Sequence, residues 1–312
     1  MLNMVIAQMS EQFQVTVGEA EFFVGLQIKQ DRDGSIFLFQ EAYTKRILER
    51  FGMDKCTPVS TPADSYSKSL HAEGETRKDI PYRELIGAVM FLMVGTRPDI
   101  AYSVSALSEF LDKPQETHWI AAKRILRFLK GTSMTGIKFS GSSELVGYSD
   151  ADFAGDELTR RSRTGLIFML NNGPVCWRSQ KQSIVSTSTC QAELGAAFSA
   201  TKDAIWLRQL LEDIGKVSEK PVQLFIDNMG TVNYIRNPFA NNQKNSKHWD
   251  VRYKYTKEVQ SAKLIDAVHV GTEGQLADAL TKPLSVKRFN SVVSQFMFSD
   301  TQARPRREGV LE

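Results

Sequence analysis

The stretch GYSDADFAGD, residues 147–156, begins at the end of the strand-like run ELVGY and leads into a polar turn. It places Asp150 at the end of the expected strand and Asp152 two residues later. A carboxylate at a strand end can be held rigidly and directed at a metal ion. Aspartate is also common in turns, because its side chain bonds the backbone two residues on. The interpretation therefore depends on other acids, and Asp150 is favoured because it lies closer to the strand.

Three further acidic residues occur at the edges of predicted elements. Glu193 lies in the first turn of a long helix, Asp227 ends the strand VQLFID, and Asp278 lies in the short helix EGQLADALTK. Four carboxylates from four elements are what a two-metal phosphodiesterase centre requires. Mg²⁺ prefers oxygen ligands, and two ions roughly 4 Å apart can clamp the attacking and leaving oxygens of an in-line displacement.

Each of these acids also has an ordinary structural explanation. An apolar stripe along the long helix continues back to Glu193, so this carboxylate would lie on the face that packs against a sheet. Burial there is costly unless the group is paired or binds metal, but Ser188 and Gln191 also fit a capping box beside it. Asp227 could cap a helix, and Asp278 could be an exposed helix acid. The hypothesis therefore rests on all four acids together.

The composition is that of a soluble globular protein, with 312 residues, 42% hydrophobic and 24% charged. This length suits two ordinary domains or one large one. No apolar run approaches the roughly 20 residues of a membrane span, and the N-terminus lacks the features of a secretory signal. Three cysteines without a CxxC pair suggest reduced thiols in an intracellular protein. The four histidines have no zinc-like spacing.

The net charge is only +3, but the cations are clustered. Residues 123–138 contain five cations and no acid, Arg160, Arg161 and Arg163 form a second cluster, and the C-terminal tail a third. Basic patches beside a carboxylate site suit a phosphate-backed substrate, although solvated surface is the commoner explanation for any single patch. The predicted nucleic-acid-binding residues are Lys123, Arg124, Arg127, Lys130, Arg161, Arg163, Lys181, Asn228 and His248.

The expected element pattern changes along the chain. Residues 22–40 indicate a β-hairpin around the turn DRDG, and a helix is expected over 41–53. Residues 81–131 indicate three short-looped helices, which would form a small bundle. The Gly-, Ser- and Thr-rich segment 131–143 is expected to be the main boundary. The second half is predicted as β-β-β-α-β-α-α-β-α, and a hairpin that leads into a βαβ unit indicates a mixed sheet with packed helices.

The chain resembles the reverse transcriptase and ribonuclease H region of copia-type LTR retrotransposon Pol polyproteins. In the first half the resemblance is carried by FFVGLQIKQDRDGSIFLFQ, PYRELIGAVMFLM, TRPDIAY and KRILRFLKGT. In the second half it is carried by GYSDADFAGD, RRSRTG, PVCWRSQKQ, STCQAEL, IWLRQLL, DNMGTV, SKHWDVRY and QLADALTKPL. Several motifs in the right order are highly specific, whereas no single one would be.

The resemblance implies a ribonuclease H fold over about residues 144–283, with Asp150, Glu193, Asp227 and Asp278 as the catalytic, metal-binding acids. The implied reaction is hydrolysis of the RNA strand of an RNA–DNA hybrid by two Mg²⁺ ions, for which Mn²⁺ can substitute. The preference for RNA would come from contacts to 2′-hydroxyls. The implied partners are RNA, DNA, their hybrid and the rest of a Pol polyprotein, without a membrane. The implied location is the cytoplasm, in virus-like particles of an intact element, or the nucleus.

The expected fold class is α/β, a ribonuclease H-like mixed five-stranded sheet with packed helices. It would be preceded by a truncated reverse-transcriptase palm end and a thumb or connection bundle of helices. Four domains are expected. They are the palm end at 1–60, the thumb or connection helices with a linker at 61–140, the ribonuclease H-like domain at 141–283, and a C-terminal helix and tail at 284–312.

The departures from the family also lead to expectations. The family's polymerase site needs a Tyr-x-Asp-Asp hairpin, and this chain contains no Asp-Asp dipeptide, so no DNA synthesis is expected from it alone. His269 is expected to be a partly buried strand residue rather than a mobile catalytic histidine. The expected function is an RNA–DNA hybrid endoribonuclease. The alternatives are a non-catalytic nucleic-acid-binding fragment, an inert transposon relic, and another nuclease of this fold such as an integrase, which the order Asp, Glu, Asp, Asp disfavours.

Overall fold

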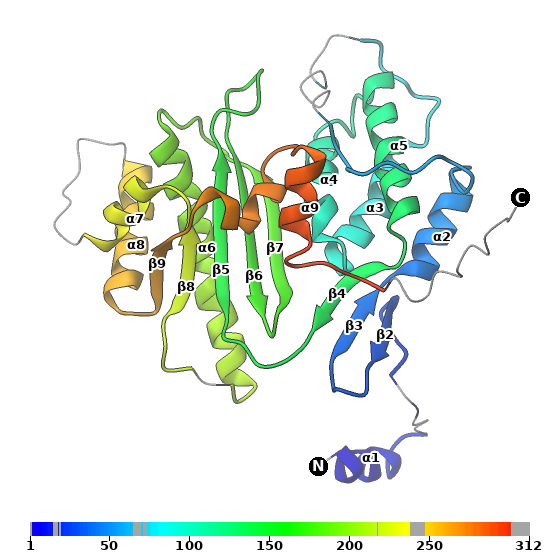
Figure 1. Cartoon of the computed structure of the whole chain (residues 1–312), viewed down its shortest axis with the longest axis horizontal. Coiled ribbons are helices and arrows are strands. Elements are labelled where there is room, and N and C mark those ends of the chain that lie inside the picture. The colour runs from blue at the N-terminus through cyan, green and yellow to red at the C-terminus, as the bar shows by residue number, and fades with distance from the viewer. Residues whose placement is uncertain are drawn as a thin grey trace, which may run out of the picture.

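The described residues of this chain form two five-stranded sheets with helices packed around them (Figure 1). The structure is a computed structural model. It describes residues 2–14, 18, 20–64, 70, 74–216, 218–237 and 247–300. None of the helices in this part of the chain combines the length and hydropathy that crossing a bilayer requires.

The first sheet is antiparallel and joins the N-terminal hairpins to strands from far along the chain. In spatial order its strands are β1 (Phe22–Phe23), β2 (Leu26–Gln30), β3 (Ile36–Phe39), β4 (Thr135–Phe139) and β10 (Phe298–Ser299). The predicted arm FFVGLQIKQ is interrupted at Val24 and Gly25, whose positive φ angles of 47° and 80° form a tight turn between β1 and β2. β4 arises from the segment expected to be a linker and pairs with both β3 and β10.

The second sheet has the mixed topology that the sequence predicts. Its strands are β5 (Val146–Asp152), β6 (Arg163–Leu170), β7 (Gly173–Lys181), β8 (Val222–Ile226) and β9 (Ile265–His269). The first three pair antiparallel, whereas β8 is parallel to both β5 and β9. The spatial order is β7-β6-β5-β8-β9, which puts the first strand at the centre. The ribonuclease H-like mixed sheet with packed helices is therefore confirmed.

Helices and short 3₁₀ turns cover both faces of this sheet. They are α6 (Thr189–Asp213), α7 (Met229–Arg236), α8 (Lys247–Ser261), η3 (Thr272–Gly274), η4 (Leu276–Leu280) and α9 (Val286–Val293). α6 lies on one face, whereas η4 and α9 lie on the other (Figure 1). Alternation along β6 supports both layers, because Leu166 and Phe168 pack with α6 while Ile167 and Met169 pack with η4 and α9. The predicted last helix of the core is thus two short 3₁₀ helices.

The apolar stripe of α6 is buried where it crosses the sheet. Ala197, Ala200 and Ala204 are fully buried, and their small side chains let the helix approach the strands closely. Ile214 is 64% exposed, because α6 ends at the residue before it. The same face begins near Glu193, so the position of this acid follows from the packing of the helix.

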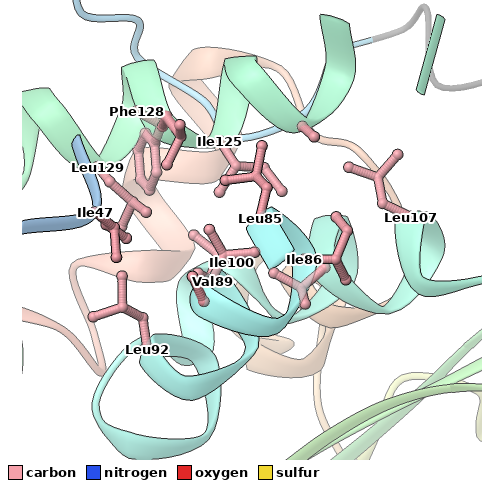
Figure 2. Packing of buried hydrophobic residues seen from close by; sticks show 14 of the residues in the cluster. Ile47, Leu85, Ile86, Val89, Leu92, Ile100, Leu107, Ile125, Phe128 and Leu129 are labelled. Atoms are coloured by element: carbon pink, nitrogen blue, oxygen red, sulfur yellow. The ribbon is translucent and has the colours of Figure 1, made fainter. Parts of the chain in front are cut away.

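The first half of the chain contains the predicted bundle of helices. Its elements are α2 (Glu41–Arg50), α3 (Tyr82–Gly95), η2 (Pro98–Ile100), α4 (Ala101–Ser108) and α5 (Glu116–Gly131). Figure 2 shows apolar side chains from α2, α3 and α5 meeting in one cluster, among them Ile47, Leu85, Val89, Ile125 and Leu129. α1 (Leu2–Ser10) lies apart from this bundle and from both sheets (Figure 1).

A fully buried ion pair fixes the junction between α3 and α4. The Arg97 guanidinium donates to both carboxylate oxygens of Asp99, at 2.9 and 2.7 Å. It also donates to the carbonyl and hydroxyl oxygens of Thr132, at 3.0 and 2.7 Å. A buried charge needs such complete pairing. The motif TRPDIAY therefore has a structural role here.

Candidate active site

Three of the four predicted acids converge at one edge of the second sheet. Asp150 lies in β5, Asp227 follows β8, and Glu193 lies in the second turn of α6. β5 and β8 are parallel, with Ser149 opposite Ile226, so their carboxyl ends meet at the same edge. One carboxylate oxygen from each of the three acids lies within 4.8 Å of the others. The fold thus brings together residues up to 77 positions apart, from Asp150 to Asp227.

The local hydrogen bonds orient two of these carboxylates. Asp150 Oδ2 accepts a hydrogen bond from the Thr281 hydroxyl at 2.6 Å. Glu193 Oε1 accepts one from the backbone N–H of Ala151 at 3.3 Å. Glu193 Oε2 is buried and has no hydrogen-bond donor among the described residues. The cluster therefore has an oriented carboxylate oxygen that is free to accept a further ligand.

Burial and mutual repulsion shift the acidities of the three groups. Burial raises the pKa of Glu193 to about 9, with further contributions from the charges of Asp150 and Asp227. Burial also raises the pKa of Asp150 to about 6, although Lys282 and the Thr281 hydrogen bond oppose this shift. The pKa of Asp227 is raised by burial and by the nearby Asp278 charge. Full ionisation of all three carboxylates is therefore unfavourable unless a further cation binds among them.

These features fit a hard divalent cation. The donor set consists of carboxylate oxygens, which Mg²⁺ prefers as ligands. A cation placed among Asp150, Glu193 and Asp227 would offset the repulsion that raises their pKa values, and it would give Glu193 Oε2 a partner.

Asp278 is buried beside this cluster but is held by two cations. Its Oδ1 lies 2.8 Å from Lys282 Nζ, and its Oδ2 accepts a hydrogen bond from the Arg288 guanidinium at 2.7 Å. Asp278 lies outside the group of three, although its charge still contributes to the raised pKa values of Asp150 and Asp227. Because η4 turns it inward, Asp278 is 2% exposed rather than an ordinary surface acid. Its role as a metal ligand stays a prediction.

No family model matches the chain, but individual relatives cover nearly all of it. It is 35% identical over 283 residues to the retrovirus-related Pol polyprotein from transposon TNT 1-94 of Nicotiana tabacum, covering 88% of this chain and 21% of that protein. It is 34% identical over 295 residues to the corresponding polyprotein from transposon RE2 of Arabidopsis thaliana, covering 93% and 20%. The chain belongs to the retrovirus-related Pol polyprotein family. It spans about a fifth of the length of these two relatives.

Other similarities of this Pol-family chain cover parts of it. Secreted RxLR effector protein 161 of Plasmopara viticola is 50% identical over 132 residues, which is 42% of this chain and 93% of that protein. Among solved structures, LC11-RNase H1 in complex with RNA/DNA hybrid is 16% identical, with a TM-score of 0.34. That alignment covers 44% of this chain and 94% of the solved one.

Four of the predicted nucleic-acid-binding residues of the Pol-family chain lie on one helix, α5. They are Lys123, Arg124, Arg127 and Lys130. The first three border a cavity of about 540 Å³ between α4 and α5, whose walls are mainly apolar. Arg124 pairs with Asp64 at 2.9 Å, and Arg127 donates to the Thr57 carbonyl at 2.8 Å. Lys130 is exposed. These cations share a surface, but two of them already have partners within the protein.

The basic residues nearer the acids have different surroundings. Arg161 is exposed in the loop between β5 and β6. Arg163 is 9% exposed and is paired with Glu109 of the helix bundle. Lys181 is paired with Glu109 and also with Asp156. Arg163 and Lys181 therefore take part in internal ion pairs, which the sequence pattern does not reveal.

The other predicted residues lie at the start of α7, in α8 and at the end of β9. Asn228 caps α7, because its side-chain oxygen accepts a hydrogen bond from the Thr231 N–H at 2.8 Å. His248 belongs to α8, but its side chain lies outside the described residues. The expectation for His269 is wrong in one respect, because this residue ends β9 as predicted but is exposed. Burial raises the pKa of Asp227, and the nearby His269 counteracts part of this shift.

Sequence reasoning missed three residues that contact the acids. Thr281 and Lys282 reach Asp150 and Asp278, and Arg288 reaches Asp278 from α9. Thr281 and Lys282 follow Asp278 by three and four positions, the spacing at which side chains meet along a helical turn. That signal could have identified both of them. Arg288 depends on how α9 folds back, which local spacing does not encode.

Proposed function

We propose that this chain is a ribonuclease that hydrolyses the RNA strand of RNA–DNA hybrids and uses two divalent ions, normally Mg²⁺. The observation that carries the proposal is a cluster of three acids at the carboxyl edge of a ribonuclease H-like sheet, formed by the buried Asp150 and Glu193 and the half-buried Asp227. Membership in the Pol family and the ordered motifs of the second half support the same reaction. No DNA synthesis is assigned to the chain.

In this proposal the four acids hold the ions, with Asp278 completing the set. When bound, the ions activate a water molecule and stabilise the leaving oxygen. The protein orients the ligands beforehand, because Thr281 fixes Asp150 and the Ala151 N–H fixes Glu193. Burial of the carboxylates keeps their interaction with a cation strong.

The proposed substrate surface combines exposed cations with the edge that carries the acids. Lys130 and Arg161 are exposed and remain candidates for phosphate contacts, together with Lys123 and Arg127. Recognition of the RNA strand would use its 2′-hydroxyls. The rest of a Pol polyprotein is a proposed partner, since the chain spans about a fifth of its relatives. The proposed location is the cytoplasm, within particles of an intact element.

The test is cleavage of a hybrid whose RNA strand carries a 5′ label, in the presence of Mg²⁺. We expect the wild type to cut the RNA strand. The cleavage rate of Asp150→Asn should be lower by a factor of more than about 100, because losing a metal ligand should have a larger effect than losing a residue that orients a ligand. Asp152→Asn is the matched control, since it removes the same charge from the same strand. It should retain most of the activity.

Other outcomes would assign the alternatives. Binding of the hybrid without cleavage, seen by gel mobility for wild type and Asp150→Asn alike, would indicate a non-catalytic binding fragment. Neither binding nor cleavage by a chain with native circular dichroism would indicate an inert relic.

A further inference from the structure

A lysine ammonium lies between two of the proposed metal ligands. Lys282 Nζ is 2.8 Å from Asp278 Oδ1 and 3.8 Å from Asp150 Oδ2. Lys282 is the second residue after η4, so a single short segment supplies Asp278, Thr281 and this lysine. The ammonium is therefore a positive charge that the chain itself places in its carboxylate centre.

The two oxygens of Asp278 have different partners. Oδ2 is bound by Arg288, whose guanidinium also donates to the carbonyl oxygen of Glu273 at 3.0 Å and to that of Thr272. Arg288 is thus anchored, and it fixes the orientation of Asp278. Oδ1 lies 2.8 Å from Lys282 Nζ, and the same nitrogen lies 3.8 Å from Asp150 Oδ2. An ion shared by Asp278 and Asp150 would therefore meet the Lys282 ammonium at these two carboxylates.

Lys282 is also able to leave this position. Its side chain is 38% exposed, whereas those of Asp150 and Asp278 are 3% and 2% exposed. A lysine has a flexible stem and a strongly hydrated head, so an ammonium near solvent can move without disturbing the fold. A lysine side chain ordinarily carries a positive charge at neutral pH.

We propose that Lys282 is an internal cation that competes with the second metal ion for Asp278 and Asp150. This inference rests on the proposed two-ion function. The first ion would be held by Asp150, Glu193 and Asp227. Asp150 and Asp278 would hold the second ion, and the ammonium of Lys282 would have to leave them first. The two ions therefore bind with unequal affinity, and Lys282 acts as a positioning residue that sets the difference.

Ligand geometry makes the two cations mutually exclusive. Mg²⁺ binds carboxylate oxygens at about 2.0–2.1 Å. An ion that bridged Asp150 Oδ2 and Asp278 Oδ1 would occupy the space of a nitrogen that is now 3.8 and 2.8 Å from the same atoms. The two positive charges would also repel each other at this short distance.

The direct test is to titrate Mg²⁺ into the full chain without nucleic acid and to measure the binding by isothermal titration calorimetry. The weaker dissociation constant should fall by about tenfold or more in Lys282→Met, because the ion no longer displaces a charge. Lys282→Arg keeps the charge and should retain the weak affinity of the wild type. Lys216→Met is the matched control. This lysine is exposed and lies just after the C-terminal end of α6, whereas Glu193 lies near the N-terminal end.

A second measurement uses the wild type and does not depend on a folded variant. Lysines are acetylated briefly with and without Mg²⁺, and the modified peptides are quantified by mass spectrometry. Lys282 should react severalfold faster with Mg²⁺, since its ammonium is then released from the carboxylates. The rate at Lys216 should not change.

The outcomes separate this inference from the proposed function. Hybrid cleavage by the wild type, with equal Mg²⁺ affinities in wild type and Lys282→Met and an unchanged Lys282 acetylation rate, would overturn the role of Lys282 alone. Tighter Mg²⁺ binding in Lys282→Met without any cleavage would support it and count against the proposed substrate. Absence of Mg²⁺ binding by the wild type would overturn both.

Discussion

At the scale of single residues, Glu193 links metal binding to folding. It is 3% exposed, and burial with two neighbouring carboxylates raises its pKa to about 9. In the metal-free chain it is therefore protonated at neutral pH. A cation that binds Glu193 must displace this proton, so metal affinity should rise with pH.

The same shift predicts how the stability of the metal-free chain depends on pH. Between the ordinary glutamate pKa and about 9, the folded state holds a proton on Glu193 that the unfolded state has lost. Stability should therefore fall as the pH rises through this window. Each pKa unit corresponds to about 1.4 kcal/mol, so the loss between about pH 7 and pH 9 is roughly 2–3 kcal/mol. Urea denaturation in a chelating buffer measures it.

The matched control for this pH dependence is Glu193→Gln, which keeps the shape of the side chain and removes the titration. Its stability should fall less than that of the wild type over the same pH range. Mg²⁺ should stabilise the wild type more at the upper end of the range than at the lower end. Equal pH slopes for the two proteins would contradict the protonation of Glu193.

Single residues also show which parts of the candidate site could be predicted. Asp150, Glu193 and Asp227 could be selected because strand ends and helical periodicity place each of them without knowledge of the fold. Arg288 could not, because its contact with Asp278 depends on α9 turning back across the sheet. The internal roles of Arg163 and Lys181 were equally hidden, since a basic cluster in a sequence does not reveal its partners.

At the scale of elements, α4 attaches the helix bundle to the second sheet. Glu109, just after α4, pairs with Arg163 of β6 and with Lys181 of β7. Ser105 of α4 donates to the Ser179 carbonyl of β7 at 2.8 Å. These contacts use side chains that are only partly exposed, so they are more strongly coupled than surface pairs.

Glu109→Gln tests this attachment. The change leaves the nearly buried Arg163 without its carboxylate partner, and it should lower the free energy of unfolding by about 1–3 kcal/mol. Glu144→Gln is the control, because the Lys220–Glu144 pair is exposed on both sides and should contribute less than about 1 kcal/mol. Urea denaturation of both variants gives the comparison. A Glu109→Gln effect no larger than that of Glu144→Gln would mean that the network does not fasten the bundle.

Elements with strong local signals were predictable, and those that depend on distant partners were not. The β6–β7 hairpin was predictable from Asn172-Gly173. The turn itself lies one residue earlier, because Asn171 and Asn172 have the positive φ angles, 51° and 61°, and Gly173 begins β7. β4 and β10 lie more than 150 residues apart, and β4 pairs with β3 on one side and with β10 on the other. A Gly- and Ser-rich segment such as 131–143 has no local preference that would indicate this pairing.

At the scale of the whole molecule, the C-terminal part of the described chain connects the two halves. Phe289 of α9 packs against Phe128 of the bundle, with ring centroids 5.6 Å apart. Val292 and Phe296 lie in a separate apolar cluster with Ile167 and Met169 of the second sheet. The same helix carries Arg288, which holds Asp278. The proposed ribonuclease H-like domain, residues 141–283, is therefore covered on one face by residues beyond its boundary.

Two fragments test how far this domain is independent. Fragment 141–283 should expose the β6 face that Val292 and Phe296 cover, whereas fragment 141–300 should keep it buried. Two large apolar side chains contribute about 1.5–3 kcal/mol each when fully buried. We therefore expect the shorter fragment to unfold at lower urea concentration and to bind more of the dye ANS. Equal unfolding midpoints would show that α9 does not stabilise the domain. The Arg288–Asp278 contact would then have to form without help from this packing.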